Sequence, residues 1–459
     1  MTVSLFKKRT EVDMTQGNSL SLLLVFAFPL LLGNLFQQFY NMVDTWVVGN
    51  FVGKNSFSAV GTLGSIINTL IGFFLGFSNG ASVVISRFFG AKNFEKVSDA
   101  VHSYVAITLI LCVIFTCLGV VMVPLMLRLV KSPPEVAAEQ AIYLRIYFAG
   151  VTGLLLYNMG SAILRAVGNS TLPFVFLAVC TVLNVILDLV FVIVFKLETA
   201  GVAYATILAQ FVSAVLVVIM LLRSKSCIRV DIRKIRITKG MTKQIFGIGL
   251  PTALQQSLTA FSNVFVQSYI NVFGADAMGG WTTYSKVDQF LFLPMQSLGL
   301  AVQTYVGQNL GAGLQKRAKK GANTGLFMAM IVTAVLIVPT MMFAVPIVKF
   351  FIDDGEAGVI EFGTLFLRYL IPCHIVACVN QVYGGALRGA NKSGSAMIVM
   401  LCSFVFFRQI YLFVMSHYIS NTILPIAMGY PAGWLVCSIA IGILFTKFFS
   451  DKNNLVSVN

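Results

Sequence analysis

The chain has 459 residues, of which 58% are hydrophobic and only 11% are charged. A water-soluble protein of this length cannot bury so many apolar side chains, so the composition excludes a soluble globular fold and predicts a multi-pass membrane protein. The net charge of +15 would suit nucleic acid, but the basic residues lie between apolar segments. That placement indicates membrane orientation, and we expect no nucleic-acid partner.

Twelve apolar segments are long enough to cross a bilayer as helices, which takes about 20 residues each. Charged or turn-rich joints separate most of them, and the polar stretch His417 to Thr422 divides the last two. The sequence therefore predicts an all-α membrane protein with twelve transmembrane helices. The predicted spans are residues 20–49, 57–86, 98–127, 138–164, 170–195, 199–222, 244–273, 281–308, 321–348, 361–387, 394–416 and 423–446.

The basic residues favour one orientation of these spans. With the N-terminus inside, the alternate loops on that side hold 23 of the 32 Lys and Arg residues, and the opposite loops hold six. The positive-inside rule then places both termini in the cytoplasm, in a plasma membrane of bacterial inner-membrane type. Eight of the 23 lie in residues 223–243, which we interpret as a cytoplasmic linker between two hydrophobic halves.

The two halves repeat one another. Pro29 matches Pro251, and three further motifs recur at offsets of 221 to 223 residues, namely Phe89-Gly90-Ala91 with Leu310-Gly311-Ala312, Leu144-Arg145 with Leu367-Arg368, and the Leu-Arg pairs at Leu164 and Leu387. A nearly constant offset indicates duplication. Units of six spans face the same way, so we expect two pseudo-symmetric six-helix lobes around a central cleft. The predicted domains are residues 1–222, the linker 223–243 and residues 244–459.

No pattern typical of an enzyme site is found in the sequence. It has no GxxxxGK[ST] loop and no HExxH motif, and its eight cysteines lack CxxC spacing. We interpret the cysteines as small buried hydrophobes, and His102, His374 and His417 as structural. Secondary transport is therefore the favoured class, with no enzymatic activity and no cofactor expected.

A polar stripe marks the first span. Asn34, Gln37, Asn41 and Asp44 recur at steps of three, four and three residues, which puts them on one face of a helix. An ionisable side chain at membrane depth is costly, so this face should line a cavity or contact a partner. The alternative is a buried acid that neighbouring helices hold without a role in transport.

Three further polar side chains should lie at the depth of Asp44. Asp44 is six residues before Asn50, and Asp188 is eight residues before Lys196. At ~1.5 Å per residue, both acids lie about 9–12 Å below the outer ends of their helices. Asn184 is one turn from Asp188, and Thr206 enters its span from outside to a similar depth. These oxygen donors suit Na⁺, and two adjacent carboxylates suit a proton, so the ion stays open.

The second lobe does not repeat this acidic pair. Under the repeat offset, Asp44 corresponds to Val266, and Asp188 corresponds to Tyr411. The seventh span keeps an uncharged stripe, which we predict to line the cleft or, alternatively, to hold helices together through amides. Its members are Gln256, Thr259, Asn263 and Gln267.

Two charged residues of the second lobe leave alternatives open. Asp288 lies within the eighth span, where it binds a cationic substrate or pairs with Lys286. Arg408 lies within the eleventh span, where it neutralises a carboxylate or supports a packing joint. The 39 Phe and 18 Met residues of the chain would give an adaptable apolar lining suited to bulky amphipathic cations.

From about Leu22 to Lys447 the chain resembles the MATE family of multidrug and toxin extrusion transporters. The supporting motifs are Pro29 with Asp44-Thr45, Gly90-Ala91-Lys92, Leu164-Arg165-Ala166-Val167-Gly168-Asn169, Asn184-Val185-Ile186-Leu187-Asp188 and Val306-Gly307-Gln308-Asn309-Leu310-Gly311-Ala312-Gly313. The resemblance implies efflux of organic cations by antiport with Na⁺ or H⁺. It also implies a first-lobe cation site formed by Asp44, Asn184, Asp188 and Thr206.

The predicted substrate cleft comprises Gln37, Tyr40, Asn41, Asn158, Gln256, Asn263, Gln267 and Asp288. Some members of the family carry further essential acids in their seventh and tenth spans, whereas this chain has none in its seventh span and only Glu361, the first residue, in its tenth. A second-lobe ion site of that kind is therefore not carried over to this chain.

The leading hypothesis is a monomeric, secondary active multidrug antiporter, driven by Na⁺ or H⁺, for amphipathic cationic small molecules in a lipid bilayer. One alternative is a flippase for lipids or lipid-linked oligosaccharides, which should carry a cleft rich in Arg and Lys. Another is a membrane receptor or scaffold that binds ligands without flux.

Overall fold

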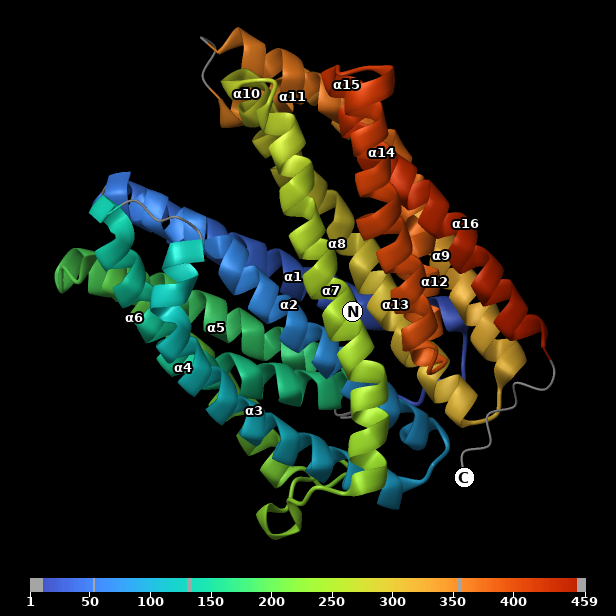
Figure 1. Ribbon diagram of the computed structural model, residues 1–459. Helices are drawn as coiled ribbons and strands as arrows, with labels where there is room; N and C mark the ends of the chain where they lie inside the picture. The colour runs from blue at the N-terminus through green and yellow to red at the C-terminus, as the bar shows by residue number, and fades with distance from the viewer. Residues whose placement is uncertain (1–10, 53, 130–133, 353–355, 452–459) are drawn as a thin grey trace, which may run out of the picture. The chain divides into compact units, whose positions relative to one another are not determined.

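The computed structural model describes residues 11–52, 54–129, 134–352 and 356–451. All regular structure in these ranges is helical (Figure 1), which confirms the predicted all-α class. The elements of the N-terminal half are α1 (Ser19–Val47), η1 (Val48–Val52), α2 (Lys54–Gly90), α3 (Phe94–Leu129), α4 (Pro134–Ala166), α5 (Thr171–Leu189), η2 (Val190–Val194), α6 (Glu198–Arg223) and η3 (Ile232–Lys234).

The C-terminal half contains more interruptions than the N-terminal half. Its elements are α7 (Lys239–Asn271), α8 (Ala275–Gly311), α9 (Gln315–Met342), α10 (Ala344–Phe351), α11 (Ala357–Leu370), η4 (Ile371–Cys373), α12 (His374–Gly389), α13 (Ser393–Leu401), η5 (Cys402–Phe407), α14 (Arg408–Val414), η6 (Met415–Ile419), α15 (Ile423–Ala427) and α16 (Gly429–Ser450). Segments η1, η2, η5 and η6 are π-helical, and η3 and η4 are 3₁₀-helical.

Helix length and composition agree with a multi-pass membrane protein. In the described part of the chain, ten helical stretches are long and apolar enough to cross a membrane. The other two predicted spans coincide with α7 and α8, which have 33 and 37 residues. Their lower hydropathy follows from the polar side chains that they carry, the stripe of α7 among them.

The chain divides into two compact units. The first contains Phe28–Gly249 and the described residues before Met14, and the second contains Met14–Ala27 and the described residues from Leu250 onward. Helices α1 and α7 each contribute to both units, and the changeover in each lies next to a proline, Pro29 or Pro251. The predicted domains 1–222, 223–243 and 244–459 stay a prediction.

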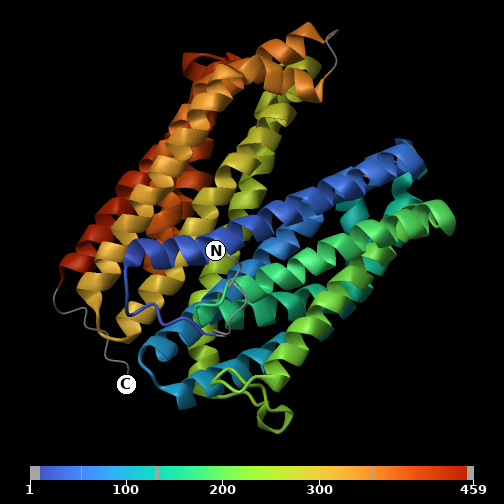
Figure 2. The ribbon, with the colours of Figure 1, turned by 180° about the vertical axis from the view of Figure 1, so that it is seen from behind.

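Glycines allow close helix packing in the first unit, where α4 packs against α2, α3 and α6. In Figure 2, which shows the ribbon from behind, α5 and α6 are the green helices in front. A Cβ atom added at Gly153 of α4 would lie 2.9 Å from the backbone nitrogen of Phe211, and one at Gly150 would lie 2.5 Å from Cβ of Ile207. Small residues thus let the backbones of α4 and α6 approach, as membrane helices commonly do.

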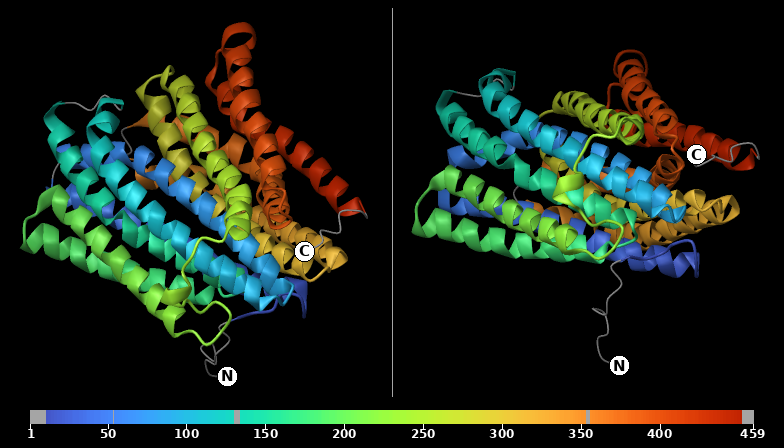
Figure 3. Two further views of the ribbon diagram at one scale, coloured as in Figure 1. Left: turned by 60° about the horizontal axis from the view of Figure 1, so that its bottom comes forward. Right: turned by 90° about the horizontal axis from the view of Figure 1, so that it is seen from below.

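The segment between α6 and α7 is a loop that packs on α3. It is the yellow-green loop in both views of Figure 3. The backbone N–H of Asp231 donates to Nε2 of His102 at 2.9 Å, and the N–H of Thr238 donates to Oγ of Ser103 at 3.3 Å. Side-chain acceptors on α3 therefore fix this basic loop.

The second unit is organised around α8, which packs against α9, α11 and α12. A Cβ atom at Gly280 of α8 would lie 2.6 Å from the backbone nitrogen of Gly363 in α11. A Cβ atom at Gly385 of α12 would collide with the carbonyl group of Gly299 in α8. The same device, glycine at a helix crossing, thus brings α8 close to both neighbours.

Candidate functional site

Four polar side chains from three helices are buried in the first unit. The exposed fraction is 8% for Asp44 of α1, 0% for Asn184 and Asp188 of α5, and 1% for Thr206 of α6. Asp44 interacts with both Asp188 and Asn184, and Tyr40, one turn before Asp44, interacts with Asp44 and Thr206. The structure thus brings together the four side chains that the sequence placed at one depth. We call them the acid cluster.

Six polar atoms of the acid cluster are buried without a hydrogen-bond partner in the described part of the chain. Among the described residues, no partner is found for Oδ1 of Asp44, either carboxylate oxygen of Asp188, either amide atom of Asn184 or Oγ1 of Thr206. Buried polar atoms are nearly always paired, and an unpaired one costs about 1–3 kcal/mol. A packing joint held by hydrogen bonds would not leave six such atoms in one place, whereas five oxygens around a cation would be satisfied.

Aromatic side chains of α4 form one wall of the acid cluster. Tyr143 and Tyr147 are buried, and their rings stack with their centroids 6.3 Å apart. Both phenols interact electrostatically with Asp44. Neither residue is among the predicted site residues. Their spacing of four residues, which puts two phenols on one face of the fourth span, was the available signal.

Both acid-bearing helices become π-helical just beyond their acid. Segment η1 begins four residues after Asp44, and η2 begins two residues after Asp188. The two segments pack on each other through a valine cluster formed by Val47, Val48, Val192 and Val202. Short π-helical segments are rare and are often found at functional sites.

The predicted cleft residues of the first unit have different surroundings. Gln37 and Tyr40 are half-buried, and Asn41 is exposed. Asn158 is buried, and its Nδ2 donates to the carbonyl oxygen of Leu154 in the same helix at 2.9 Å. Of these four residues, Tyr40 is the one that the structure places against the acid cluster.

The polar stripe of α7 is partly engaged within the second unit. Gln256 and Gln267 are half-buried, and Nε2 of Gln267 donates to Oδ1 of Asn271 at 2.8 Å. Oδ1 of Asn263 accepts a hydrogen bond from a guanidinium nitrogen of Arg408 at 2.8 Å, and the same nitrogen donates to Oγ of Ser262 at 2.9 Å. Of the two alternatives for Arg408, the contacts support the packing joint.

Asp288 does not pair with Lys286. Its Oδ1 lies 2.8 Å from Nε2 of His374 and accepts a hydrogen bond from the hydroxyl of Tyr284 at 2.9 Å. Nζ of Lys286 instead lies 5.7 Å from the ring centroid of Phe351. The pairing alternative was wrong because His374, although 86 residues away in sequence, is brought to α8 by the packing of α12.

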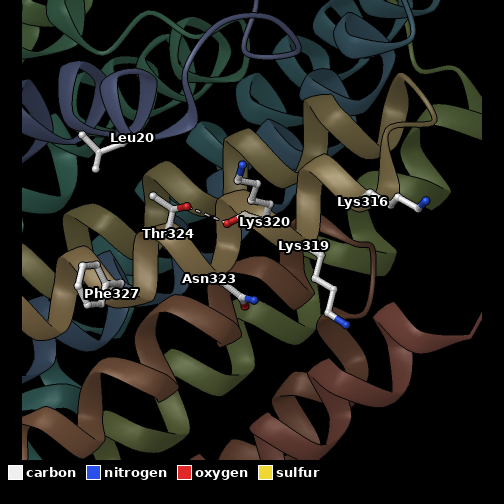
Figure 4. A pocket seen from close by; sticks show the side chains of 7 residues that line it. All are labelled: Leu20, Lys316, Lys319, Lys320, Asn323, Thr324 and Phe327. Carbon is white, nitrogen blue, oxygen red and sulfur yellow. Dashed lines mark hydrogen bonds between the residues drawn. The ribbon is translucent and has the colours of Figure 1, made fainter.

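A separate cavity of about 660 Å³ lies in the second unit. Figure 4 shows lysine side chains from α9 and Leu20 from α1 around it, with Oγ1 of Thr324 donating to the carbonyl oxygen of Lys320 at 2.9 Å. Its lining is Leu20, Lys316, Lys319, Lys320, Asn323, Thr324 and Phe327. None of these is a predicted site residue, and the lysines disfavour an organic cation there.

Long apolar helices and the buried acid cluster define a multi-pass membrane protein of the transporter class. The family model MatE matches residues 29–190 and 250–414. The chain therefore belongs to the MatE family of transporters, which confirms the predicted resemblance and means that the protein is not an enzyme.

Curated relatives match the chain over nearly its whole length. The probable multidrug resistance protein YpnP of Bacillus subtilis is 28% identical to this chain, and the matched region covers 91% of this chain and 93% of YpnP. The probable multidrug resistance protein NorM of Thermotoga maritima is 24% identical, covering 94% and 92%. The multidrug export protein MepA of Staphylococcus aureus is 23% identical, covering 82% and 83%.

Solved structures support the fold. A MOP superfamily transporter from Pyrococcus furiosus superposes with a TM-score of 0.91 at 20% identity, covering 97% of this chain and 99% of that chain. An outward-facing multidrug resistance MATE family transporter of the same superfamily superposes with a TM-score of 0.90, also at 20% identity. At this level of identity the likeness concerns the fold alone.

Proposed function

We propose that this protein exports amphipathic organic cations by antiport with Na⁺ or H⁺, and that the acid cluster binds the coupling ion. The observation that carries the proposal is the set of six unpartnered, buried polar atoms on Asp44, Asn184, Asp188 and Thr206. Five of the six are oxygens, the donor type that a small hard cation prefers. The names of the relatives support drugs as the exported class.

The same atoms can serve either ion. A sodium ion would be held by carboxylate, amide and hydroxyl oxygens from α1, α5 and α6. A proton would be shared by the carboxylates of Asp44 and Asp188, whose mutual repulsion it relieves. A bound sodium ion would join three helices of the first unit and a shared proton would join two, so in either case binding favours the conformation in which those helices are close.

The proposal also covers the cellular location of the protein and its orientation in the membrane. We place the protein, as a monomer, in the bacterial plasma membrane with both termini in the cytoplasm, because the basic residues gather in the loops on that side. The cleft residues Gln37, Tyr40, Asn41, Asn158, Gln256, Asn263, Gln267 and Asp288 are proposed to line the path of the substrate.

The test is dye export from proteoliposomes with either a Na⁺ gradient or a pH gradient imposed. We expect one gradient to drive export of a cationic dye, and Asp44→Asn and Asp188→Asn each to reduce that export at least about tenfold, which is a loss of about 1.4 kcal/mol of coupling. Asp276→Asn, which neutralises an exposed acid of α8, is the matched control and should export normally.

Two outcomes would overturn the proposal. Gradient-driven export that survives in both variants would show that the acid cluster does not bind the coupling ion. Lipid scrambling without dye export would favour the flippase alternative. The same liposomes carry both assays, so one preparation distinguishes the two functions.

A further inference from the structure

The hydrogen-bond partners of His374 determine how many protons it shares with Asp288. His374 is fully buried at the start of α12. Its Nδ1 lies 3.0 Å from the carbonyl oxygen of Ile371, and its Nε2 lies 2.8 Å from Oδ1 of Asp288. Both ring nitrogens therefore face an oxygen atom that ordinarily accepts hydrogen bonds.

A carbonyl oxygen can only accept, so Nδ1 of His374 must carry a hydrogen atom. At Nε2 the short contact with Asp288 is favourable only if a second proton lies between the two atoms. That proton is on the imidazole ring, as an imidazolium beside a carboxylate, or on the carboxyl group, beside a neutral ring. In both cases the pair holds one proton more than a neutral histidine and an ionised aspartate.

We infer that Asp288 and His374 form a proton-binding site in the second unit, distinct from the acid cluster. Oδ1 of Asp288 also accepts the hydroxyl proton of Tyr284 at 2.9 Å. An oxygen that accepts two hydrogen bonds is best served by the ionised form, so the structure assigns the shared proton to the imidazole. The inference concerns proton binding and does not rest on the proposed transport function.

A second histidine provides an internal comparison. His102 of α3 is also buried, and its Nδ1 lies 2.7 Å from the carbonyl oxygen of Ser98. Its Nε2, however, accepts a hydrogen bond from the backbone N–H of Asp231 at 2.9 Å. One nitrogen of His102 must donate and the other must accept, which describes a neutral ring. The fold thus assigns different proton counts to two buried histidines.

The groups around the pair leave the shared proton on His374 and Asp288. Phe292 and Trp434 flank the imidazole in T-shaped contacts, each with its ring centroid 5.0 Å away, and neither ring can take up the proton. Among the described residues, Tyr284 and Tyr430 are titratable groups that interact with Asp288. Cys373 lies near Tyr284, and Arg408 lies near Tyr430. The guanidinium of Arg408 stacks on Tyr430 at 4.7 Å and is bonded to α7.

Loss of the proton would break the side-chain contact between Asp288 of α8 and His374 of α12. A bare Nε2 lone pair and a carboxylate oxygen repel one another at 2.8 Å, so the two side chains would separate. The side chain of Asp288 is already 24% exposed, and once released it can bind another cation. Asp288 can therefore either share the proton with His374 or bind another cation, but it cannot do both at once.

The test uses the full-length protein in lipid nanodiscs, with isotope-labelled histidine and aspartate observed by NMR. The chain has only three histidines, so His102→Gln and His417→Gln assign the signals. At pH about 7.5 we expect two protonated ring nitrogens on His374 and one on His102. A neutral His374 beside a protonated Asp288 would also support the site, with the proton on the other partner.

A neutral His374 beside an ionised Asp288 at that pH would overturn the inference. Asp288→Asn keeps the shape of the partner but supplies an amide N–H that can donate to Nε2. We expect that variant to reduce His374 to one protonated nitrogen and to leave His102 unchanged, whereas a His374 signal unaffected by Asp288→Asn would contradict the pairing. Asp276→Asn, which alters an exposed acid at the start of the same helix, is the matched control and should leave all three signals unchanged.

Discussion

At the scale of single residues, the acid cluster is the least satisfied part of the first unit. Six of its carboxylate, amide and hydroxyl atoms are removed from solvent and lack partners among the described residues. Each such atom costs free energy that a bound cation would recover. The cluster should therefore link the stability of the protein to the concentration of its ion.

We expect the coupling ion to raise the melting temperature of the purified protein. A ligand that binds only the folded state stabilises it by about 2.7 kcal/mol at a hundred times its dissociation constant. Thermal unfolding in detergent, followed by tryptophan fluorescence over a Na⁺ titration and over a pH series, measures this effect. Asp188→Asn should abolish the response, and a response equal to that of the unaltered protein would argue against ion binding at the cluster.

Cys227, in the loop after α6, gives a pH-dependent prediction outside the membrane. Burial, reinforced by the nearby Glu11 carboxylate 3.6 Å away, raises the pKa of the Cys227 thiol to about 12. Since the thiolate is the reactive form, alkylation of Cys227 at neutral pH should be slower than that of a free cysteine by roughly a thousandfold. Mass spectrometry of maleimide-treated protein measures the rate.

Glu11→Gln removes the neighbouring negative charge from Cys227 and should speed this alkylation, because it lowers the pKa of the thiol. Denatured protein provides the reference rate for the same cysteine. Equal rates in the folded and denatured states would mean that the contact between Glu11 and Cys227 does not persist in solution.

At the scale of elements, the crossing of α4 and α6 depends on glycine. Gly153→Ala would put a Cβ atom 2.9 Å from the backbone nitrogen of Phe211, so the helices must separate, at a cost of about 1–3 kcal/mol. Gly247→Ala in α7 is the matched control, because its Cβ meets nothing within 4 Å.

In melting experiments, Gly247→Ala should leave stability unchanged or raise it by about 0.5–1 kcal/mol, since alanine favours helix over glycine. Gly153→Ala should lower the melting temperature. Similar melting temperatures for the two variants would show that α4 and α6 are not in close backbone contact in the membrane.

At the scale of the whole molecule, the two compact units have different chemistry. The first places two carboxylates together without a basic partner among its described contacts, whereas the second pairs its membrane-embedded acid with a histidine. Effects at sites without shared partners are usually independent. The doubly altered protein Asp44→Asn, Asp188→Asn should therefore keep both ring protons on His374.

The histidine NMR signals described above measure this independence directly. A His374 that loses a proton when Asp44 and Asp188 are both replaced by asparagine would reveal coupling between the units. Dye export is measured on the same variant, in which transport should be lost. The NMR signals then report proton binding in the second unit independently of transport.

Features that depend on local sequence were predictable from the sequence. Apolar segment length gave the helices, and the rise per residue placed Asp44, Asp188 and Thr206 at a common depth. Contacts between distant segments were not. His374 reaches Asp288 because α12 packs on α8. Tyr143 of α4 interacts with Asp44 of α1, a helix that is distant in sequence. The π-helical segments η1 and η2 were not predicted either, because their valine-rich sequences carry no signal that distinguishes a π-helix from an ordinary helix in a membrane.

The π-helical segments have a consequence for the C-terminal ends of the spans that begin with α1 and α5. A helix advances by about 100° per residue around its axis, and a π-helical turn shifts the backbone hydrogen-bond register by one residue. A change of register within Val48–Val52 would therefore rotate the side chains that follow it in this segment by about that angle and leave the Asp44 carboxylate where it is. The surface at this end of the span can thus be altered by evolution, one residue at a time, without rebuilding the acid cluster.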